Sequence, residues 1–353
     1  MRGTLCQGSN PYAAKEIARS SPIVTCDWTG RVISINIDTD SHGVKLDCPH
    51  GLPTEFEALS ELVALRVAGA LGFTNGGAEI SEIMYPLASL SWLAVVCLPS
   101  NSLKGRVPDV CDTHTGFAFD SALERLELSD NELTGALPGD GLKCATQLKK
   151  IDVSYNDLTG VLPDVWADSL HQLRELKFNN NPRLTGSLPT AWFPPLRDDE
   201  SGGSPEFLEY RFSNLKSLDG TDCDLTGALP SNLGGASSLE TLKLGGNRSE
   251  GSVPGSVVRL TQLRELNVRR NKLTGALPAN VFEALADTLH TVNLAHNALS
   301  GAFPPFPTTG YPVLRDVDVS ENDFDGALPS FGAVSLLFLN VAHNSLVGSF
   351  PDP

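Results

Sequence analysis

The chain has 353 residues, of which 41% are hydrophobic, 32 are glycine and 24 are proline, a composition typical of an ordered, turn-rich protein. Its 42 acidic and 26 basic residues leave a formal net charge of −16, which disfavours nucleic acid and anionic membranes as partners. No run of about 18 apolar residues occurs, and the first residues lack the apolar core of a signal peptide. The sequence therefore predicts no membrane insertion within this chain, so that any anchor would lie outside it.

The N-terminal part of the chain carries two degenerate strand patterns. Ile35 and Ile37 lie two residues apart, as do Leu65 and Val67 further on, but neither pair is followed by an asparagine. On an extended strand such pairs point to one face. We expect residues 1–60 to form a cap with a degenerate first coil, and residues 61–353 to form a repeat array.

One sequence pattern then recurs through the chain. The segment from Leu123 to Pro138 returns 25 residues later, and the copies that follow are mostly 22 to 26 residues apart. Each copy ends its first strand with an asparagine, and Cys223 takes that place once. The predicted ladder asparagines are Asn101, Asn131, Asn156, Asn181, Asn247, Asn271, Asn297, Asn322 and Asn344.

Each position of the repeat has a physical role. Leu266 and Val268 point into a core, and the residues beside them point outward. Asn271 stands where the chain bends, and its amide can satisfy backbone groups of the neighbouring coil that would otherwise be buried without partners. Gly275 permits a tight turn and Pro278 ends any second short strand. Because a single coil cannot bury its own apolar face, the coils must stack.

The array is predicted to contain about twelve coils, with one interruption. The spacing of 42 residues between Asn181 and Cys223 exceeds one repeat by about 17 residues. The excess, at about residues 194–211, is polar and rich in proline and glycine, so we expect a loop insertion there. The chain stops in mid-repeat at Pro353, which predicts a truncated C-terminus.

These residues resemble the plant-type leucine-rich repeat, LxxLxLxxNxLxGxLP, of receptor-like kinase ectodomains, polygalacturonase inhibitors and trypanosomatid surface antigens. The resemblance implies an α/β solenoid, a right-handed superhelix with a concave parallel β-sheet, a second short sheet and few regular helices. It also implies recognition of a protein, peptide or glycan, without a cofactor.

The segment from Cys26 to Gly30 is similar to the start of the CxWxGVxC cap of those families, in which the tryptophan here is Trp28. Ile33 stands where the second cysteine would be. The resemblance thus implies a cap disulfide of Cys26 with either Cys6 or Cys48, and the sequence does not choose between them. Trp28 is expected to cover the edge of the first coil.

The outward positions of the concave sheet form the predicted partner-binding surface, because the solenoid would hold them rigidly in a row. They are Glu127, Asp152, Lys177, Asp219, Lys243, Asn267, Arg269, Asn293 and Asp318.

No motif of a catalytic or metal site accompanies the repeats. His290, His296 and His343 do not converge as metal ligands would, and no GxSxG, HExxH or nucleotide-binding loop is present. The sequence predicts a non-catalytic recognition module, extracellular or on the cell surface, as in a receptor ectodomain or a surface antigen. The alternatives are a cytoplasmic scaffold or adaptor and an inhibitor of a secreted hydrolase.

Overall fold

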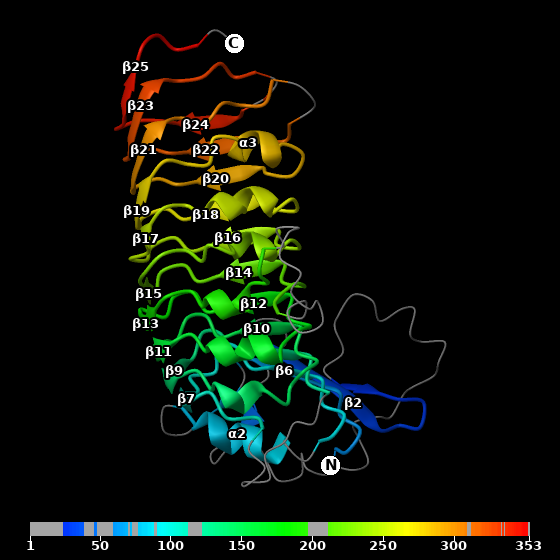
Figure 1. Cartoon of the computed structure of the whole chain (residues 1–353). Coiled ribbons are helices and arrows are strands. Elements are labelled where there is room, and N and C mark those ends of the chain that lie inside the picture. Colours follow the sequence, from blue (N-terminus) through cyan, green and yellow to red (C-terminus); the bar gives the residue numbers. More distant parts are fainter. Residues whose placement is uncertain are drawn as a thin grey trace. The chain divides into compact units, whose positions relative to one another are not determined.

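The structure is a computed structural model that describes residues 24–38, 46–47, 59–69, 71–72, 77–87, 90–111, 122–196, 211–308, 312–332, 334 and 336–351. It divides into two compact units, Met1–Leu158 and Thr159–Pro353, which are treated separately. In both units successive coils are stacked, and each coil contributes one strand to a long sheet (Figure 1).

In the first unit the long-sheet strands follow the order of the chain. They are β1 (Val24–Cys26), β2 (Val32–Asp38), β4 (Ala64–Ala68), β6 (Val95–Cys97), β8 (Arg125–Glu127) and β10 (Lys150–Asp152). β1 runs antiparallel to β2 and so covers its edge, whereas β2, β4, β6, β8 and β10 are parallel. The two degenerate strand patterns found in the sequence, at Ile35 and Ile37 and at Leu65 and Val67, therefore lie in strands of this sheet, β2 and β4.

In the second unit the long-sheet strands are all parallel neighbours. They are β12 (Glu175–Lys177), β14 (Ser217–Asp219), β16 (Thr241–Lys243), β18 (Glu265–Asn267), β20 (Thr291–Asn293), β22 (Asp316–Asp318) and β24 (Phe338–Asn340). Their registers match the repeat, since Leu218, Leu242 and Leu266 lie on successive strands at equivalent positions.

A second set of short strands follows the ladder positions. The first unit has β3 (Leu46–Asp47), β5 (Leu71–Gly72), β7 (Lys104–Gly105) and β9 (Glu132–Ala136), and β11 (Asp157–Val161) begins at its end. The second unit has β13 (Arg183–Gly186), β15 (Asp224–Leu225), β17 (Glu250–Gly251), β19 (Lys272–Gly275), β21 (Ala298–Ala302), β23 (Asp323–Ala327) and β25 (Ser345–Val347). The second short sheet that the resemblance implies is thus divided, because in the second unit β17, β19, β21, β23 and β25 form one sheet while β13 and β15 belong to another.

Short helical turns close most coils. They are α2 (Ile80–Leu87), η3 (Asp140–Leu142), η4 (Asp164–Asp168), η5 (Thr190–Trp192), η6 (Leu233–Gly235), η7 (Gly255–Arg259) and α3 (Val281–Ala284). Pro163, Pro189 and Pro254 directly precede η4, η5 and η7, where the fixed φ of proline favours the start of a helical turn. None of the helices in the described residues has the length and hydrophobicity needed to span a bilayer.

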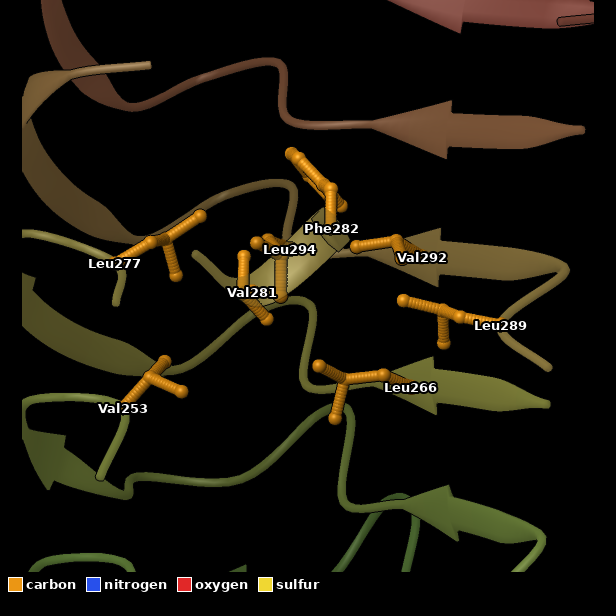
Figure 2. A pocket seen from close by; sticks show the side chains of 8 residues that line it. All are labelled: Val253, Leu266, Leu277, Val281, Phe282, Leu289, Val292 and Leu294. Atoms are coloured by element: carbon orange, nitrogen blue, oxygen red, sulfur yellow. The ribbon is translucent and has the colours of Figure 1, made fainter. Parts of the chain in front are cut away.

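The core lies between the strands and the helical turns of each coil. In the second unit Trp166 and Trp192 stack with ring centroids 6.2 Å apart, and the Trp192 indole donates to the Pro163 carbonyl at 2.8 Å. Figure 2 shows a small cavity between α3 and strands β18 and β20 that only apolar side chains line: Val253, Leu266, Leu277, Val281, Phe282, Leu289, Val292 and Leu294. A cavity with no polar lining is a packing gap, and it offers no group that could orient a ligand.

The predicted asparagine ladder is present. The Asn156 amide donates to the carbonyls of Val153 and Ser154 in its own coil and of Leu128 in the preceding coil, at 3.0–3.1 Å. Its oxygen accepts the N–H of Leu133 at 2.9 Å. One side chain thus satisfies backbone groups of two coils and fixes their spacing.

Cys223 replaces one asparagine without leaving its neighbours unpaired. Its thiol donates to the Phe178 carbonyl at 3.3 Å but offers no strong acceptor. The coil before it has one more residue between Asn181 and Leu184 than the other coils have, and the Leu184 N–H donates to the Asn181 carbonyl at 3.0 Å. This local turn supplies the acceptor that the thiol lacks.

A disulfide joins Cys111 to Cys144, with their Cα atoms 5.5 Å apart. The two cysteines follow the Pro-containing turns of successive coils, so the bond links one coil to the next. Cys97 and Cys223 are buried free thiols. Sequence reasoning did not find this pair, because the two cysteines lie at different distances from the prolines of their repeats, three residues after Pro108 and six after Pro138.

Cys26 is also disulfide-bonded, whereas Cys6 and Cys48, its two candidate partners, lie outside the described residues, as does most of the predicted insertion at 194–211. Trp28 is 94% exposed, so the expectation that it covers the edge of the first coil is wrong. It projects from a turn in which the Asp27 carboxylate accepts the backbone N–H groups of Thr29 and Arg31.

Two substitutions test how the ladder works. We expect Asn247→Ala to lower the free energy of unfolding by about 3 kcal/mol, because it leaves the Leu225 N–H and the Gly220 carbonyl without a partner. It also removes one of the two hydrogen bonds that the Leu244 and Gly245 carbonyls accept.

Cys223→Ala removes one weak thiol donor, which contacts the Phe178 and Thr221 carbonyls, and should cost about 1 kcal/mol. Urea denaturation of the two variants measures the difference in the free energy of unfolding. Equal losses would contradict the idea that the bond from the Leu184 N–H to the Asn181 carbonyl replaces the bond that an asparagine at position 223 would make.

The disulfide gives a second prediction. Replacing Cys111 and Cys144 together by serine should lower the free energy of unfolding by about 4 kcal/mol, because the 33-residue separation no longer restrains the unfolded chain. Denaturant titration measures the loss, and peptide mapping of the unreduced wild type shows whether the two cysteines are linked. An unchanged denaturation midpoint in the double variant would argue against an inter-coil role for this bond.

Candidate ligand-binding surface

The outward face of the long sheet is built by the two residues that flank the buried centre of each strand. In β18 the centre is Leu266, and Glu265 and Asn267 point to the opposite face. Because the strands are parallel and in register, equivalent side chains of successive coils form rows about 4.8 Å apart. Of the nine residues predicted to bind a partner, eight lie in the row that follows the strand centres, and Arg269 lies two residues further along its coil.

Five of the nine predicted residues also hydrogen-bond to the backbone just beyond the end of their own strands. Side-chain oxygens of Asp152, Asp219, Asn267, Asn293 and Asp318 accept the backbone N–H two residues on, at 3.1–3.3 Å. The hydroxyls of Ser154 and Ser320 donate to the same oxygens of Asp152 and Asp318 at 2.6 Å. These turns satisfy backbone groups where each strand stops, a role that the repeat pattern alone did not reveal.

Three more of the predicted residues are held in ion pairs with residues of the outward row before the strand centres. The Lys177 ammonium lies 2.7 Å from Glu175, and that of Lys243 lies 2.9 Å from Glu265 on the next strand. Glu127 contacts Arg125 of its own strand and Lys150 of the next. Arg125, Lys150, Glu175 and Glu265 were missed as members of this surface, although they alternate with the buried residues as outward positions must.

Arg269 differs from the other eight. Its side chain is exposed, and within the described part of the chain no ion pair or side-chain hydrogen bond holds it. Among these nine residues its guanidinium is therefore the group most available to a partner.

Glu127 and Cys97 form a partly buried polar pair at the start of this surface. Burial alone would raise the pKa of the Glu127 carboxyl, but hydrogen bonds from Arg125 and Cys97 and the charge of Lys150 outweigh burial and lower it. Burial and the neighbouring Glu127 raise the pKa of the Cys97 thiol to about 12. Cys97 is therefore a neutral hydrogen-bond donor at physiological pH, and not a reactive thiolate.

A second row borders this face where each coil turns toward the short strands. The residue before each ladder position has φ between 52° and 57° at Ser100, Asp130, Tyr155, Asn180, Asp222, Arg270, His296, Glu321 and His343, and 69° at Gly246. The turn thus requires the left-handed conformation but accepts many side chains. His343 lies 3.7 Å from Glu321, and no group of three or more metal-ligating side chains converges among the described residues.

Comparisons with known proteins agree with this architecture. A family model described as Leucine Rich Repeat matches residues 147–168. The structure matches the plant peptide hormone receptor RGFR1, solved with RGF2, at a TM-score of 0.60 and 23% identity over 85% of this chain and 47% of that one. It also matches the Arabidopsis receptor kinase HAESA, solved with the peptide hormone IDA and the co-receptor SERK1, at a TM-score of 0.61 and 21% identity, over 99% of this chain and 64% of that one.

The fold is a leucine-rich-repeat solenoid with a long parallel sheet and few helices, and it resembles the ectodomains of plant leucine-rich-repeat receptors. Its sequence is 31% identical to Receptor-like protein 18 of Arabidopsis thaliana over 218 residues, or 59% of this chain. It matches about a fifth of that relative's length, 22%. The chain is thus similar in sequence to a receptor-like protein and similar in fold to two receptor structures solved with peptide hormones.

The Glu127 cluster predicts a dependence of stability on pH. The pKa of the Glu127 carboxyl is lowered in the folded protein. Its ionised form therefore contributes fully to the free energy of unfolding when the pH is well above the ordinary glutamate pKa of 4.5, and this contribution is lost as the pH falls below that value. We expect Glu127→Gln to lower the free energy of unfolding by about 1 to 2 kcal/mol at pH 7, and by progressively less as the pH falls below the ordinary glutamate value of 4.5. Urea denaturation at each pH measures this, and a difference independent of pH would show that the charge of Glu127 is not involved.

Proposed function

We propose that this chain is the recognition segment of an extracellular receptor-like protein and binds an extended peptide on the outward face of its long sheet. The observation that carries the proposal is its relationship to Receptor-like protein 18, together with a fold shared with two receptors whose structures were solved with peptide hormones. The residues proposed to contact the ligand are Glu127, Asp152, Lys177, Asp219, Lys243, Asn267, Arg269, Asn293 and Asp318.

The chemistry of the face supports a peptide ligand. Its outward groups are carboxylates, amides, ammonium groups and the Arg269 guanidinium, held in rows by a sheet whose register is fixed. An extended peptide offers backbone N–H and C=O groups along its whole length, which such rows can bind. The side-chain amides of Asn267 and Asn293 use their oxygens internally, so their N–H groups remain to donate.

The disulfides support an extracellular location. The Cys111–Cys144 bond and the disulfide of Cys26 are expected in an oxidising compartment and are rare in the cytosol. They therefore disfavour the cytoplasmic scaffold considered from the sequence. The division into a cap at residues 1–60 and a repeat array at 61–353 remains a prediction.

Ligand capture tests the proposal. The purified protein, immobilised with its disulfides intact, is exposed to the peptide fraction of the extracellular fluid of cells that make it. Retained peptides are identified by mass spectrometry and resynthesised. We expect Lys243→Glu combined with Arg269→Glu to weaken binding of the synthetic peptide at least tenfold, equivalent to about 1.4 kcal/mol.

Arg248→Glu combined with Lys272→Glu is the matched control, because it makes the same change in charge next to the short strands β17 and β19. Its affinity should stay within about twofold of wild type. Equal weakening in both variants would place the contact elsewhere, and failure to retain any peptide would argue against peptide recognition.

A further inference from the structure

One margin of the long sheet in the second unit carries a row of cations. The row consists of the residue that follows the first buried apolar residue of each repeat, and we call it the basic margin: Arg174, Lys216, Glu240, Arg264, His290 and Arg315. Each backbone N–H in the row donates to the carbonyl of the preceding member at 2.7–2.9 Å. The side chains are therefore held at intervals of one coil, about 4.8 Å.

The margin is positively charged although the chain as a whole is acidic. Its four Arg and Lys residues and one Glu give a formal charge of +3, against −16 for the whole chain. Glu240 lies 2.7 Å from Lys216 and 3.7 Å from Arg264. Both cations remain exposed, with 55% and 65% of their side chains accessible, so one carboxylate does not neutralise the row.

The two ends of the margin are solvent-facing arginines. Arg174 and Arg315 are exposed, and their side chains make no ion pair or hydrogen bond with any described residue. Each of these arginines has an acidic neighbour in sequence. Glu175, which follows Arg174, pairs with Lys177, and Asp316 follows Arg315. The N–H groups of both guanidinium groups can therefore donate to a ligand, although the chain is rich in carboxylates.

The residues flanking the margin on its outer side are neutral and polar. They precede the first buried apolar residue of each repeat and are Gln172, Asn214, Ser238, Gln262 and Thr288, except that the apolar Val313 holds this place beside Arg315. The corresponding margin in the first unit is different, since it consists of Ile33, Val63, Ala94 and the mutually paired Glu124 and Lys149. The positive row is thus a local feature of the second unit and not a property of the repeat.

We propose that the basic margin binds carboxylate side chains of an acidic peptide, and that it sets the charge preference of the ligand whose binding to the neighbouring face is proposed above. A single file of cations fits a narrow, extended ligand, which can contact the row alone. A duplex or an anionic membrane would instead approach the net negative charge of the whole chain and be repelled. Guanidinium groups suit this role because they bind carboxylates through paired hydrogen bonds.

The experiment uses two labelled synthetic peptides of about fifteen residues, one alternating glutamate with serine and the other alternating glutamine with serine. Fluorescence anisotropy measures their binding to the disulfide-intact protein. We expect the glutamate peptide to bind wild type at least tenfold more tightly than the glutamine peptide. Its affinity should fall as NaCl is raised, because exposed charges are screened.

Paired variants locate the contact. Arg264→Ala combined with Arg315→Ala should weaken binding of the glutamate peptide about tenfold. The control, Arg248→Ala combined with Lys272→Ala, also removes one ion-paired and one exposed cation of the second unit and should leave binding within about twofold of wild type. Equal thermal denaturation of the two variants establishes that both are folded.

Three results would overturn the proposal. The first is equal affinity of wild type for the glutamate and glutamine peptides. The second is an equal loss of affinity in the margin variant and in the control variant. The third is that the glutamate peptide does not bind, while an oligogalacturonate of matched charge binds and loses affinity in the margin variant. If the glutamate probe fails but a captured peptide still needs Lys243 and Arg269, only the charge preference is lost. If the glutamate peptide binds but no natural peptide is retained, the proposed carboxylate binding by the basic margin is supported and the proposed receptor function is not.

Discussion

Every coil of this protein must turn sharply out of the long sheet without leaving buried backbone groups unpaired. The turn passes through a left-handed residue, which costs about 1 to 2 kcal/mol for most side chains, and it buries carbonyls that no strand partner reaches. The asparagine that follows binds those carbonyls and one N–H of the preceding coil. Coil spacing, strand register and the stacked core all follow from this side chain, and where Cys223 replaces it the preceding coil has a compensating turn.

The same constraint shapes the outward face. A strand that ends after three residues needs acceptors for the N–H groups that follow, and Asp or Asn supplies them from the outward row. Those side chains are thereby oriented before any ligand arrives, which lowers the entropy lost on binding. Stability and recognition thus use the same residues, and each carboxylate or amide has only part of its hydrogen-bonding capacity left for a partner.

The charged outward positions vary more from coil to coil than the buried positions do. The ladder and the buried rows are nearly invariant along the chain, whereas equivalent outward positions carry Lys, Asp, Asn or Glu. Since exposed charges contribute little to stability, outward positions whose side chains do not bond the backbone can vary with little cost to the fold. The basic margin of the second unit shows the result, because it concentrates cations at one edge of an acidic protein whose scaffold does not require them there.

The fold class, the ladder and the rows of outward residues could all be predicted from the order of the amino acids, because each depends on a local pattern repeated at a nearly constant interval. The tertiary structure was needed to show which outward residues are used in turns and ion pairs, which cations stay exposed without an ion pair among the described residues, and that Cys111 bonds Cys144. The disulfide and the ion pairs between strands depend on the distance between atoms of different coils. That distance is set by stacking, which the spacing of residues within one repeat does not encode.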